Sequence, residues 1–325
     1  MAHLPVRVLG SSSALPARRL TTGQVLALST STQPPDLIRG KTGIDARHWT
    51  SPGETMAELA AEALAGALDQ AGLEAAAVKR LIFVNSTGGD QLLPPTSNLV
   101  MKALGLAGSC DCFDLNNACM GFLTALDLAA RSVTTGLEPV AVVVVEFLSR
   151  FIRADDTRPF VVFGDAAAAA ILGPATGDEG VLGLALSNDP TEGGSIWLSH
   201  PSVTGDAAET IRFLHSNANM GEIALGALIG SAREVLRQSG LTLDDVDWFV
   251  PHQPNGRMLD KTLDALQIPE GKIVRVVDQI GSVGAAAMAV SFDRLRRERP
   301  VKAGDRVLFA GVGTGVACGA MLLQI

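Results

Sequence analysis

One cysteine stands where it could act as a nucleophile. Cys119 lies in DLNNACMGFLTALDLA, from Asp114 to Ala129, where polar residues give way to an apolar helical pattern. A thiol in the first turn of a helix faces unpaired backbone N–H groups and the positive end of the dipole, which lower its pKa. We therefore predict a thiolate that attacks an acyl carbon. The alternative, a small buried core residue, is kept for Cys110, Cys112 and Cys318.

The histidines offer one candidate base. His252 follows the apolar stretch VDWFV in a loop with Pro251 and Pro254, just past the end of a predicted strand, where catalytic residues often lie. Cys119 also follows a predicted strand end, FDL, so we expect packing of the two segments to bring thiol and imidazole together. The remaining histidines are interpreted as surface residues: His3, His48, His200 and His215.

A glycine-rich loop near the C-terminus offers hydrogen-bond donors. AGVGTGVACG, from Ala310 to Gly319, follows the predicted strand DRVLF, and too little chain follows it for a dinucleotide-binding βαβ unit. Glycine lets backbone N–H groups approach a reacting carbonyl closely. We predict an oxyanion hole made by the N–H groups of Cys119 and Thr314; the alternative is a plain turn between core strands.

Composition excludes several classes of function. The 325 residues carry a net charge of −8, which argues against nonspecific binding of nucleic acid. The four cysteines have no paired metal-binding spacing and indicate a reduced, cytoplasmic protein without a metal site. The first residues lack the apolar core of a signal peptide, and runs such as Val140–Val145 are too short to cross a membrane.

The elements that must position these residues occur twice. Leu59–Thr87 and Ile229–Asn255 each predict an amphipathic helix, a Gly-Leu stop and a strand. The spacing that separates Gly72 from Gly240 also separates Gly136 from Gly304, which indicates an internal duplication. Continuous apolar strands suit sheets covered by helices on both faces. We predict an α/β fold with two halves, 1–175 carrying the cysteine and 176–325 carrying the histidine and the glycine loop.

Taken together, these segments resemble the thiolase superfamily and, within it, the ketoacyl synthase III-like enzymes. Five motifs match in order over nearly the whole chain: KTGIDARHW, DLNNACMGF, FGDAAAAAIL, PHQPNGRML and GVGTGVACG. The resemblance implies a five-layered αβαβα subunit, a homodimer, and an acyl-enzyme on Cys119, with His252 assisting the second half-reaction. It implies no permanently bound cofactor; the substrate is an acyl-CoA, or an acyl group on the phosphopantetheine of an acyl carrier protein.

One position departs from the family pattern. Ser282, in DQIGSVGAAAMAV, stands where the family has a catalytic Asn, which with the His binds the malonyl thioester oxygen as an enolate forms. A serine hydroxyl offers one donor on a shorter arm, and losing one such donor costs on the order of 100-fold in rate. We therefore expect an acyltransferase of secondary metabolism that moves the acyl group through Cys119 to a non-malonyl acceptor, an alcohol, amine or thiol, with His252 as base. The alternatives are a decarboxylative 3-oxoacyl-ACP synthase III, a non-catalytic partner subunit and a cysteine hydrolase.

Several residues are predicted to bind the substrate or its carrier. The family's Trp at the coenzyme A entrance falls near Leu37 here, which favours a carrier protein over CoA as donor. Lys41 and Arg150 match basic positions at that entrance, Arg257 beside the catalytic loop suits carrier docking, and Asn255 is a further family position. We expect the acyl chain to contact Ser86–Asn98 and Pro201–Met220. The sequence leaves open which acyl group and which acceptor are used.

Overall fold

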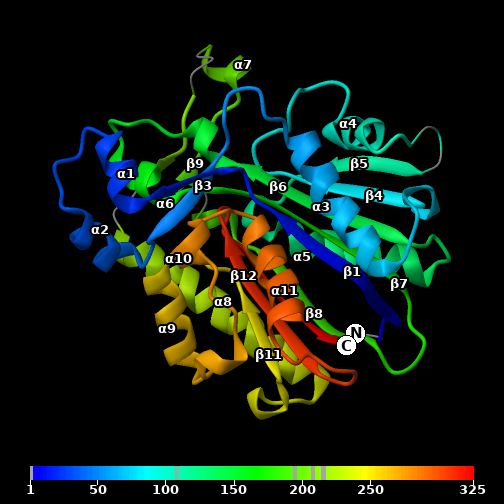
Figure 1. Ribbon diagram of the computed structural model, residues 1–325. Coiled ribbons are helices and arrows are strands. Elements are labelled where there is room, and N and C mark those ends of the chain that lie inside the picture. Colours follow the sequence, from blue (N-terminus) through cyan, green and yellow to red (C-terminus); the bar gives the residue numbers. More distant parts are fainter. Residues whose placement is uncertain (1–2, 107, 109, 193–195, 206–208, 214–216) are drawn as a thin grey trace.

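Two β-sheets form the centre of the molecule (Figure 1). The computed structural model describes residues 3–106, 108, 110–192, 196–205, 209–213 and 217–325. The first sheet has the order β1-β7-β6-β4-β5 and the second β11-β12-β13-β8. The strands of the first are β1 (Val6–Ala14), β4 (Arg80–Val84), β5 (Asp111–Leu115), β6 (Val140–Phe147) and β7 (Asp165–Pro174). Those of the second are β8 (Gly180–Asn188), β11 (Trp248–Pro251), β12 (Arg306–Gly313) and β13 (Ala317–Gln324).

The two sheets share one topology. β4 pairs in parallel with β6, which pairs antiparallel with β7, which pairs antiparallel with β1. β11, β12, β13 and β8 repeat this order and these directions, and β5 extends only the first sheet. The matched glycines also adopt matching backbone angles, with φ of 65° and 67° at Gly72 and Gly240, and 87° at both Gly136 and Gly304. The predicted internal duplication is confirmed.

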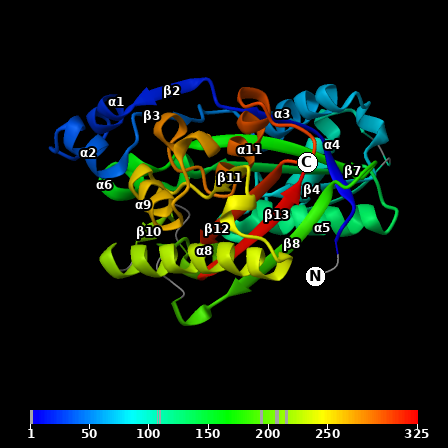
Figure 2. The same ribbon diagram turned by 90° about the horizontal axis from the view of Figure 1, so that it is seen from below.

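Helices cover both faces of each sheet, which makes five layers (Figures 1 and 2). The outer face of the first sheet packs against α3 (Met56–Ala71) and α4 (Thr96–Ala103). The outer face of the second packs against α8 (Asn217–Ser239) and α9 (Gly256–Leu266). Between the sheets lie α5 (Gly121–Thr134) and α11 (Ala286–Glu298).

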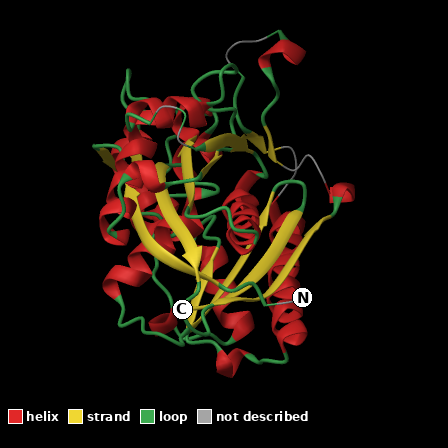
Figure 3. Ribbon diagram, turned by 90° about the vertical axis from the view of Figure 1, so that its right-hand side faces the viewer, coloured by secondary structure: helices red, strands yellow, loops and turns green. Residues whose placement is uncertain are grey.

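Strand alternation explains the layering. In β6, Val142 and Val144 face the core between the sheets, whereas Val143 and Val145 face α3. Every residue of β6 is buried, so this strand reads as one apolar run rather than as an alternating pattern. Figure 3 shows the strands enclosed by helices in this way. The predicted αβαβα fold is confirmed.

The smaller elements gather at one end of the sheets, toward the left and the top in Figure 1. The strands there are β2 (Arg18–Thr21), β3 (Ala46–Trp49), β9 (Ile196–Trp197) and β10 (Arg212–Phe213). The helices of this group and its surroundings are α1 (Thr22–Ala27), α2 (Pro35–Thr42), α6 (Thr157–Val162), α7 (Pro201–Thr204) and α10 (Val277–Ile280).

The chain passes from one sheet to the other between Pro174 and Gly180. Residues from both sides of this point share the central core, so the halves 1–175 and 176–325 are packed into one body. Their description as two domains stays a prediction. Among the described residues, no helix combines the length and the apolar character that a membrane span needs.

A short helix, α6, precedes β7. The helix ends at Val162, and Asp165 is the first residue of the strand. The Asp165 carboxylate accepts hydrogen bonds from the backbone N–H groups of Thr50 (2.7 Å) and Ser149 (2.8 Å). Asp165 therefore ties the start of the strand to two neighbouring segments.

Candidate active site

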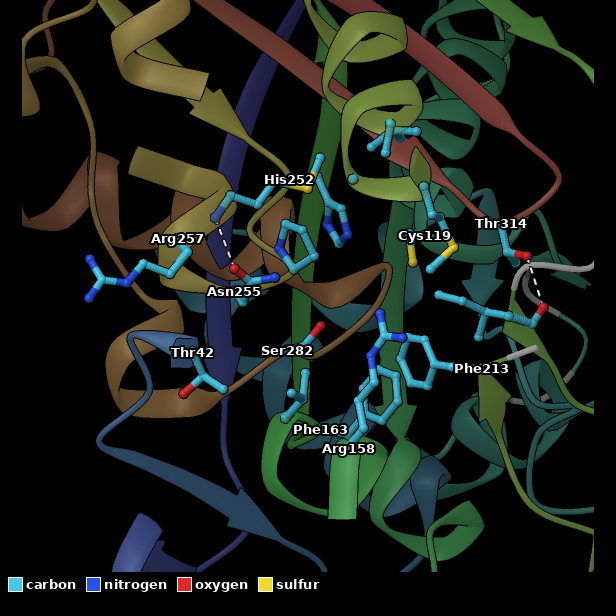
Figure 4. Close-up of a pocket in the computed structure, with 18 of the residues that line it drawn as sticks. Thr42, Cys119, Arg158, Phe163, Phe213, His252, Asn255, Arg257, Ser282 and Thr314 are labelled. Atoms are coloured by element: carbon cyan, nitrogen blue, oxygen red, sulfur yellow. Dashed lines mark hydrogen bonds between the residues drawn. The ribbon is translucent and has the colours of Figure 1, made fainter. Parts of the chain in front are cut away.

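A cavity of about 640 Å³ opens where the two halves meet (Figure 4). The first half contributes Cys119 to its wall, and the second contributes His252, Ser282 and Thr314. The residues predicted to do the chemistry, which lie far apart in the sequence, thus face one space.

A short turn places Cys119 at the end of β5. A 3-10 turn, Ala118–Met120, carries the cysteine, and α5 begins only at Gly121, two residues later than predicted. Asn116 Oδ1 accepts a hydrogen bond from the Ala118 N–H (3.0 Å), and Ala118 has a φ of 45°, which non-glycine residues seldom adopt. A Cβ atom at Gly313 would lie 3.2 Å from the Cys119 nitrogen, so the glycine loop contacts the backbone of the nucleophile.

The electrostatics of Cys119 contradict the expected activation. The residue is partly buried and lines the cavity. Burial, and secondly the charge of Glu146, raise the pKa of its thiol to about 12, which the Cys119 backbone N–H offsets only in part. The lowered pKa that we predicted from the helix N-terminus is therefore wrong, because desolvation outweighs the backbone dipoles.

Glu146 is a buried carboxyl group that the sequence analysis missed. It belongs to β6 and is fully buried. Its carboxylate accepts hydrogen bonds from the Ser86 hydroxyl (2.7 Å) and from the Ala285 N–H (3.3 Å), just before α11. Burial raises its pKa to about 7, although these donors act in the opposite direction. The available signal was a single charged residue in the apolar run VAVVVVEF.

His252 follows β11, and its backbone N–H donates to the Ala310 carbonyl (2.8 Å). The residue is only 4% exposed, and its Nδ1 has no hydrogen-bond partner among the described residues. Burial lowers the pKa of the imidazole to about 4. The ring is therefore neutral near pH 7.

The neighbouring residues of this loop hold it in place. Gln253 is fully buried; its amide NH₂ donates to the Val274 carbonyl (2.9 Å), and its oxygen accepts from the Val276 N–H (3.0 Å). Asn255 lines the cavity, but its side chain also accepts a hydrogen bond from the Met258 N–H (2.8 Å) as the N-cap of α9.

Ser282 is fixed by its backbone. Its N–H donates to the Val162 carbonyl (2.9 Å), and its carbonyl accepts from the Gly164 N–H (3.0 Å). The hydroxyl points into the cavity in Figure 4 and has no hydrogen-bond partner within the described part of the chain. It is a donor available to a ligand.

Thr314 lines the cavity beside Cys119, and its hydroxyl donates to the Ile196 carbonyl (3.0 Å). That bond ties the glycine loop to β9. The function of the Thr314 N–H as an oxyanion donor stays a prediction.

The predicted binding residues divide into two groups. Lys41, Arg257 and Asn255 line the cavity, with Arg257 paired to Asp260 (3.7 Å). Arg150 is not a cavity residue: its guanidinium donates to the Glu54 carbonyl and lies 3.7 Å from Asp90. Arg158, eight residues further on, reaches the cavity instead of Arg150; the sequence analysis missed it because the α6 turn that redirects the chain was not predicted.

The segments predicted to hold the acyl chain also divide. Phe213 and Met220, from Pro201–Met220, line the cavity, whereas no residue of Ser86–Asn98 does. That second segment instead leaves Leu92 and Leu93 70% and 84% exposed.

Most residues given a structural interpretation lie elsewhere. Cys110, Cys112 and Cys318 are absent from the cavity wall. His3 and His200 are exposed, His48 is half-buried with its Nδ1 2.6 Å from the Pro16 carbonyl, and His215 lies outside the described residues. Within the described ranges, no group of three His, Cys, Asp or Glu side chains is placed to hold a metal ion.

Known proteins match this chain over nearly all of its length. Residues 113–190 match the family model of 3-oxoacyl-[acyl-carrier-protein] synthase III, and residues 236–325 match the model of its C-terminal part. A β-ketoacyl-[acyl-carrier-protein] synthase III of Rhizorhabdus wittichii is 32% identical over 325 residues, and a 3-oxopimeloyl-[acyl-carrier-protein] synthase of Brucella abortus is 33% identical over 329; each alignment covers 98% of both chains. The crystal structure of a 3-oxoacyl-[acyl-carrier-protein] synthase III from Aquifex aeolicus superposes with a TM-score of 0.90 at 26% identity, covering 98% of this chain and 100% of that one.

Proposed function

This chain belongs to the 3-oxoacyl-[acyl-carrier-protein] synthase III family, and we propose that it joins an acyl group to a malonyl group by decarboxylative condensation on Cys119. The observation that carries this proposal is the shared cavity of Cys119, neutral His252 and Ser282, whose hydroxyl has no hydrogen-bond partner among the described residues. The reaction needs one nucleophile and two hydrogen-bond donors, and these three side chains supply them.

In the first half-reaction, Cys119 takes the acyl group. The sulfur attacks the carbonyl carbon of an acyl thioester, the carbon–sulfur bond to the donor breaks, and the donor thiol leaves with the Cys119 proton. Backbone N–H groups of Cys119 and of the Thr314 loop stabilise the negative charge on the carbonyl oxygen. The contact between Gly313 and the Cys119 backbone supports this placement of the two donors.

In the second half-reaction, a malonyl thioester loses CO₂ and becomes an enolate. The enolate carbon attacks the acyl group, a carbon–carbon bond forms, and the released Cys119 sulfur takes up a proton from solvent. His252 Nε2–H and the Ser282 hydroxyl donate hydrogen bonds to the enolate oxygen. Ser282 thus takes the place of the family's Asn with one donor instead of an amide.

The state of His252 favours condensation over transfer to an alcohol or amine. A general base works best when its pKa lies near the working pH, and the pKa of His252 is lowered to about 4. A buried neutral imidazole is a weak base at pH 7 but a good hydrogen-bond donor. The names of the similar proteins, which are synthases, favour the same reaction, and so condensation replaces our sequence-based preference for a non-malonyl acceptor.

Acyl transfer to a non-malonyl acceptor is the second candidate. The observation that favours it is Ser282 itself, because a hydroxyl on a short arm reaches less far than an amide. In that reaction His252 takes a proton from an alcohol, amine or thiol as the acceptor attacks the acyl-enzyme.

The positive mouth of the cavity suits a phosphopantetheine carrier. Lys41, Arg257 and Lys261 line the cavity, and Arg257 is exposed. These charges would attract the phosphates of CoA or the acidic surface of a carrier protein.

We also propose a homodimer, in which a second copy of the chain buries the exposed side chains of Leu92 and Leu93. Light scattering on the purified protein measures its mass in solution and so tests the dimer directly.

The test is a malonyl-dependent assay of CO₂ release. The enzyme, hexanoyl-CoA and malonyl-acyl carrier protein should yield CO₂ and a 3-oxoacyl carrier of the corresponding mass, and Cys119→Ala should yield neither. Ser282→Ala should slow CO₂ release about 100-fold while acylation of Cys119 continues. Condensation is excluded if Cys119 becomes acylated, malonyl thioester is untouched, and an added amine or alcohol removes the acyl group; an increase in CO₂ release in Ser282→Asn would then point to a lost condensing function.

A further inference from the structure

The described part of the cavity wall carries positively charged side chains and no negatively charged ones. Among the described residues that line it are Lys41, Arg158, Arg257 and Lys261, and there is no Asp or Glu. Lys41 belongs to α2, and Arg257 and Lys261 belong to α9. These three side chains form the positive mouth of the cavity described above. Arg158 belongs to α6, which forms a different wall, and the proposed reaction leaves it without a function.

The Arg158 side chain is presented to the cavity by two aromatic rings. Its guanidinium carbon lies 3.8 Å from the centre of the Phe213 ring, and Phe213 stacks on Phe163 at 6.1 Å with 21° between the rings. In Figure 4 the guanidinium projects into the cavity between Ser282 and Phe213, on the side of Cys119. Stacking on an aromatic face holds a guanidinium in one plane while leaving its N–H edge free.

Arg158 lacks a carboxylate partner in the described structure. It takes part in none of the ion pairs there, and the acid that acts on its charge is Asp156, which is exposed outside the cavity. Partial burial lowers the pKa of the guanidinium, which remains charged at any working pH. A charge that has lost part of its water without gaining a counter-ion is satisfied best by an anionic ligand group.

We propose that Arg158 selects acyl groups that end in a carboxylate, so that the acyl donor is the monothioester of a dicarboxylic acid. This inference rests on the proposed acylation of Cys119. The methylene chain would lie against the apolar part of the wall, near Ile196, Phe213 and Val316, and the terminal carboxylate would accept two N–H bonds from the guanidinium. A plain alkyl chain in the same place would cover the guanidinium and offer it no acceptor.

The phosphates of CoA are a second source of negative charge, and the test separates the two. Glutaryl-pantetheine and pentanoyl-pantetheine have acyl chains of the same length, and neither carries a phosphate. Mass spectrometry of the intact protein gives the rate of Cys119 acylation by each. We expect wild type to prefer glutaryl by about 10- to 100-fold, the size of a charged hydrogen-bonded pair.

Arg158→Met should abolish this preference and change the pentanoyl rate less than threefold. The matched control is Arg150→Met, which removes an arginine outside the cavity and should keep the preference. Equal rates for the two acyl groups in wild type would overturn the inference and leave the proposed function standing. If Arg158→Met lowers the rate of Cys119 acylation equally for glutaryl-CoA and pentanoyl-CoA, and leaves the rate with pantetheine donors unchanged, Arg158 binds the phosphates of CoA. That result would also overturn the inference. No adduct from any donor would overturn both proposals.

Discussion

Replacing Glu146 by Gln removes a charge that opposes the Cys119 thiolate and keeps the shape of the side chain. Burial and then Glu146 raise the thiol pKa from 9.0 to about 12, a shift worth about 4 kcal/mol. Burial is the larger cause, so Glu146 accounts for the smaller share of the shift, and a share of about one pKa unit corresponds to about tenfold in thiolate population. A thiolate of lower pKa is also a weaker nucleophile, with a Brønsted slope of about 0.4–0.5. The two effects together leave Cys119 in Glu146→Gln about threefold faster as a nucleophile than in wild type.

The pH dependence gives this prediction its sign. The pKa of Glu146 is raised to about 7, so the carboxyl is charged above pH 7 and neutral below it. Glu146→Gln and wild type should therefore be alkylated at Cys119 at the same rate at pH 5.5. At pH 8.5 the variant should react about threefold faster, because only wild type then carries the opposing charge.

The assay is alkylation by iodoacetamide, followed at the Cys119 peptide by mass spectrometry between pH 5.5 and 9. Asp293→Asn is the matched control, since Asp293 is equally buried in α11 but bonds to Ser11 (3.2 Å) and Ser13 (2.6 Å) instead. Its profile should follow wild type. The reasoning would be refuted if the ratio of the alkylation rates of Glu146→Gln and wild type stayed constant from pH 5.5 to 9. It would also be refuted if the variant reacted more slowly than wild type at pH 8.5.

Three further substitutions test the site. The folded-state pKa of His252 is lowered from 6.5 to about 4, so its neutral form contributes stability above pH 6.5 that is lost as the pH falls to 4. Urea unfolding at pH 6.5 and at pH 4 measures this loss in the free energy of unfolding, which should be about 3 kcal/mol smaller in His252→Asn than in wild type. Gly313→Ala brings a methyl group to 3.2 Å from the Cys119 nitrogen, and should slow Cys119 acylation about 10- to 100-fold with an unchanged melting temperature. Asn255→Ala removes the N-cap of α9 and should cost about 1 kcal/mol in urea unfolding, which Asn255→Asp should restore.

The fold was largely predictable because its signals are local and repeated. The paired glycines mark helix ends and strand starts in both halves, and their backbone angles agree. Cys119 and His252 were also predictable, since each follows the end of a strand, one in each sheet, and packing of the two related halves brings both ends to one cavity. Their protonation was not predictable, because it depends on how much water the other half of the chain removes.

The directions of individual side chains explain the remaining differences between the predicted and the observed site residues. Arg150 and Arg158 lie eight residues apart, and only the turn into α6 decides which of them reaches the cavity. Glu146 was hidden because a buried strand gives no alternation that marks which face a side chain takes. Its partners, Ser86 and Ala285, come from distant parts of the sequence.

The two protonation states also constrain how the first half-reaction begins. The thiol of Cys119 has a pKa of about 12 and the imidazole of His252 of about 4. Both directions disfavour the transfer of a proton from the sulfur to the ring, since burial penalises the thiolate and the imidazolium alike. A preformed thiolate–imidazolium pair is therefore disfavoured as the resting nucleophile. The thiol must instead lose its proton as the thioester is attacked, when the donor's departing sulfur provides an acceptor of its own and the backbone N–H groups have a negative oxygen to bind. Cys119 and His252 are thus both neutral near pH 7, and the substrate supplies the developing charge that the backbone donors stabilise.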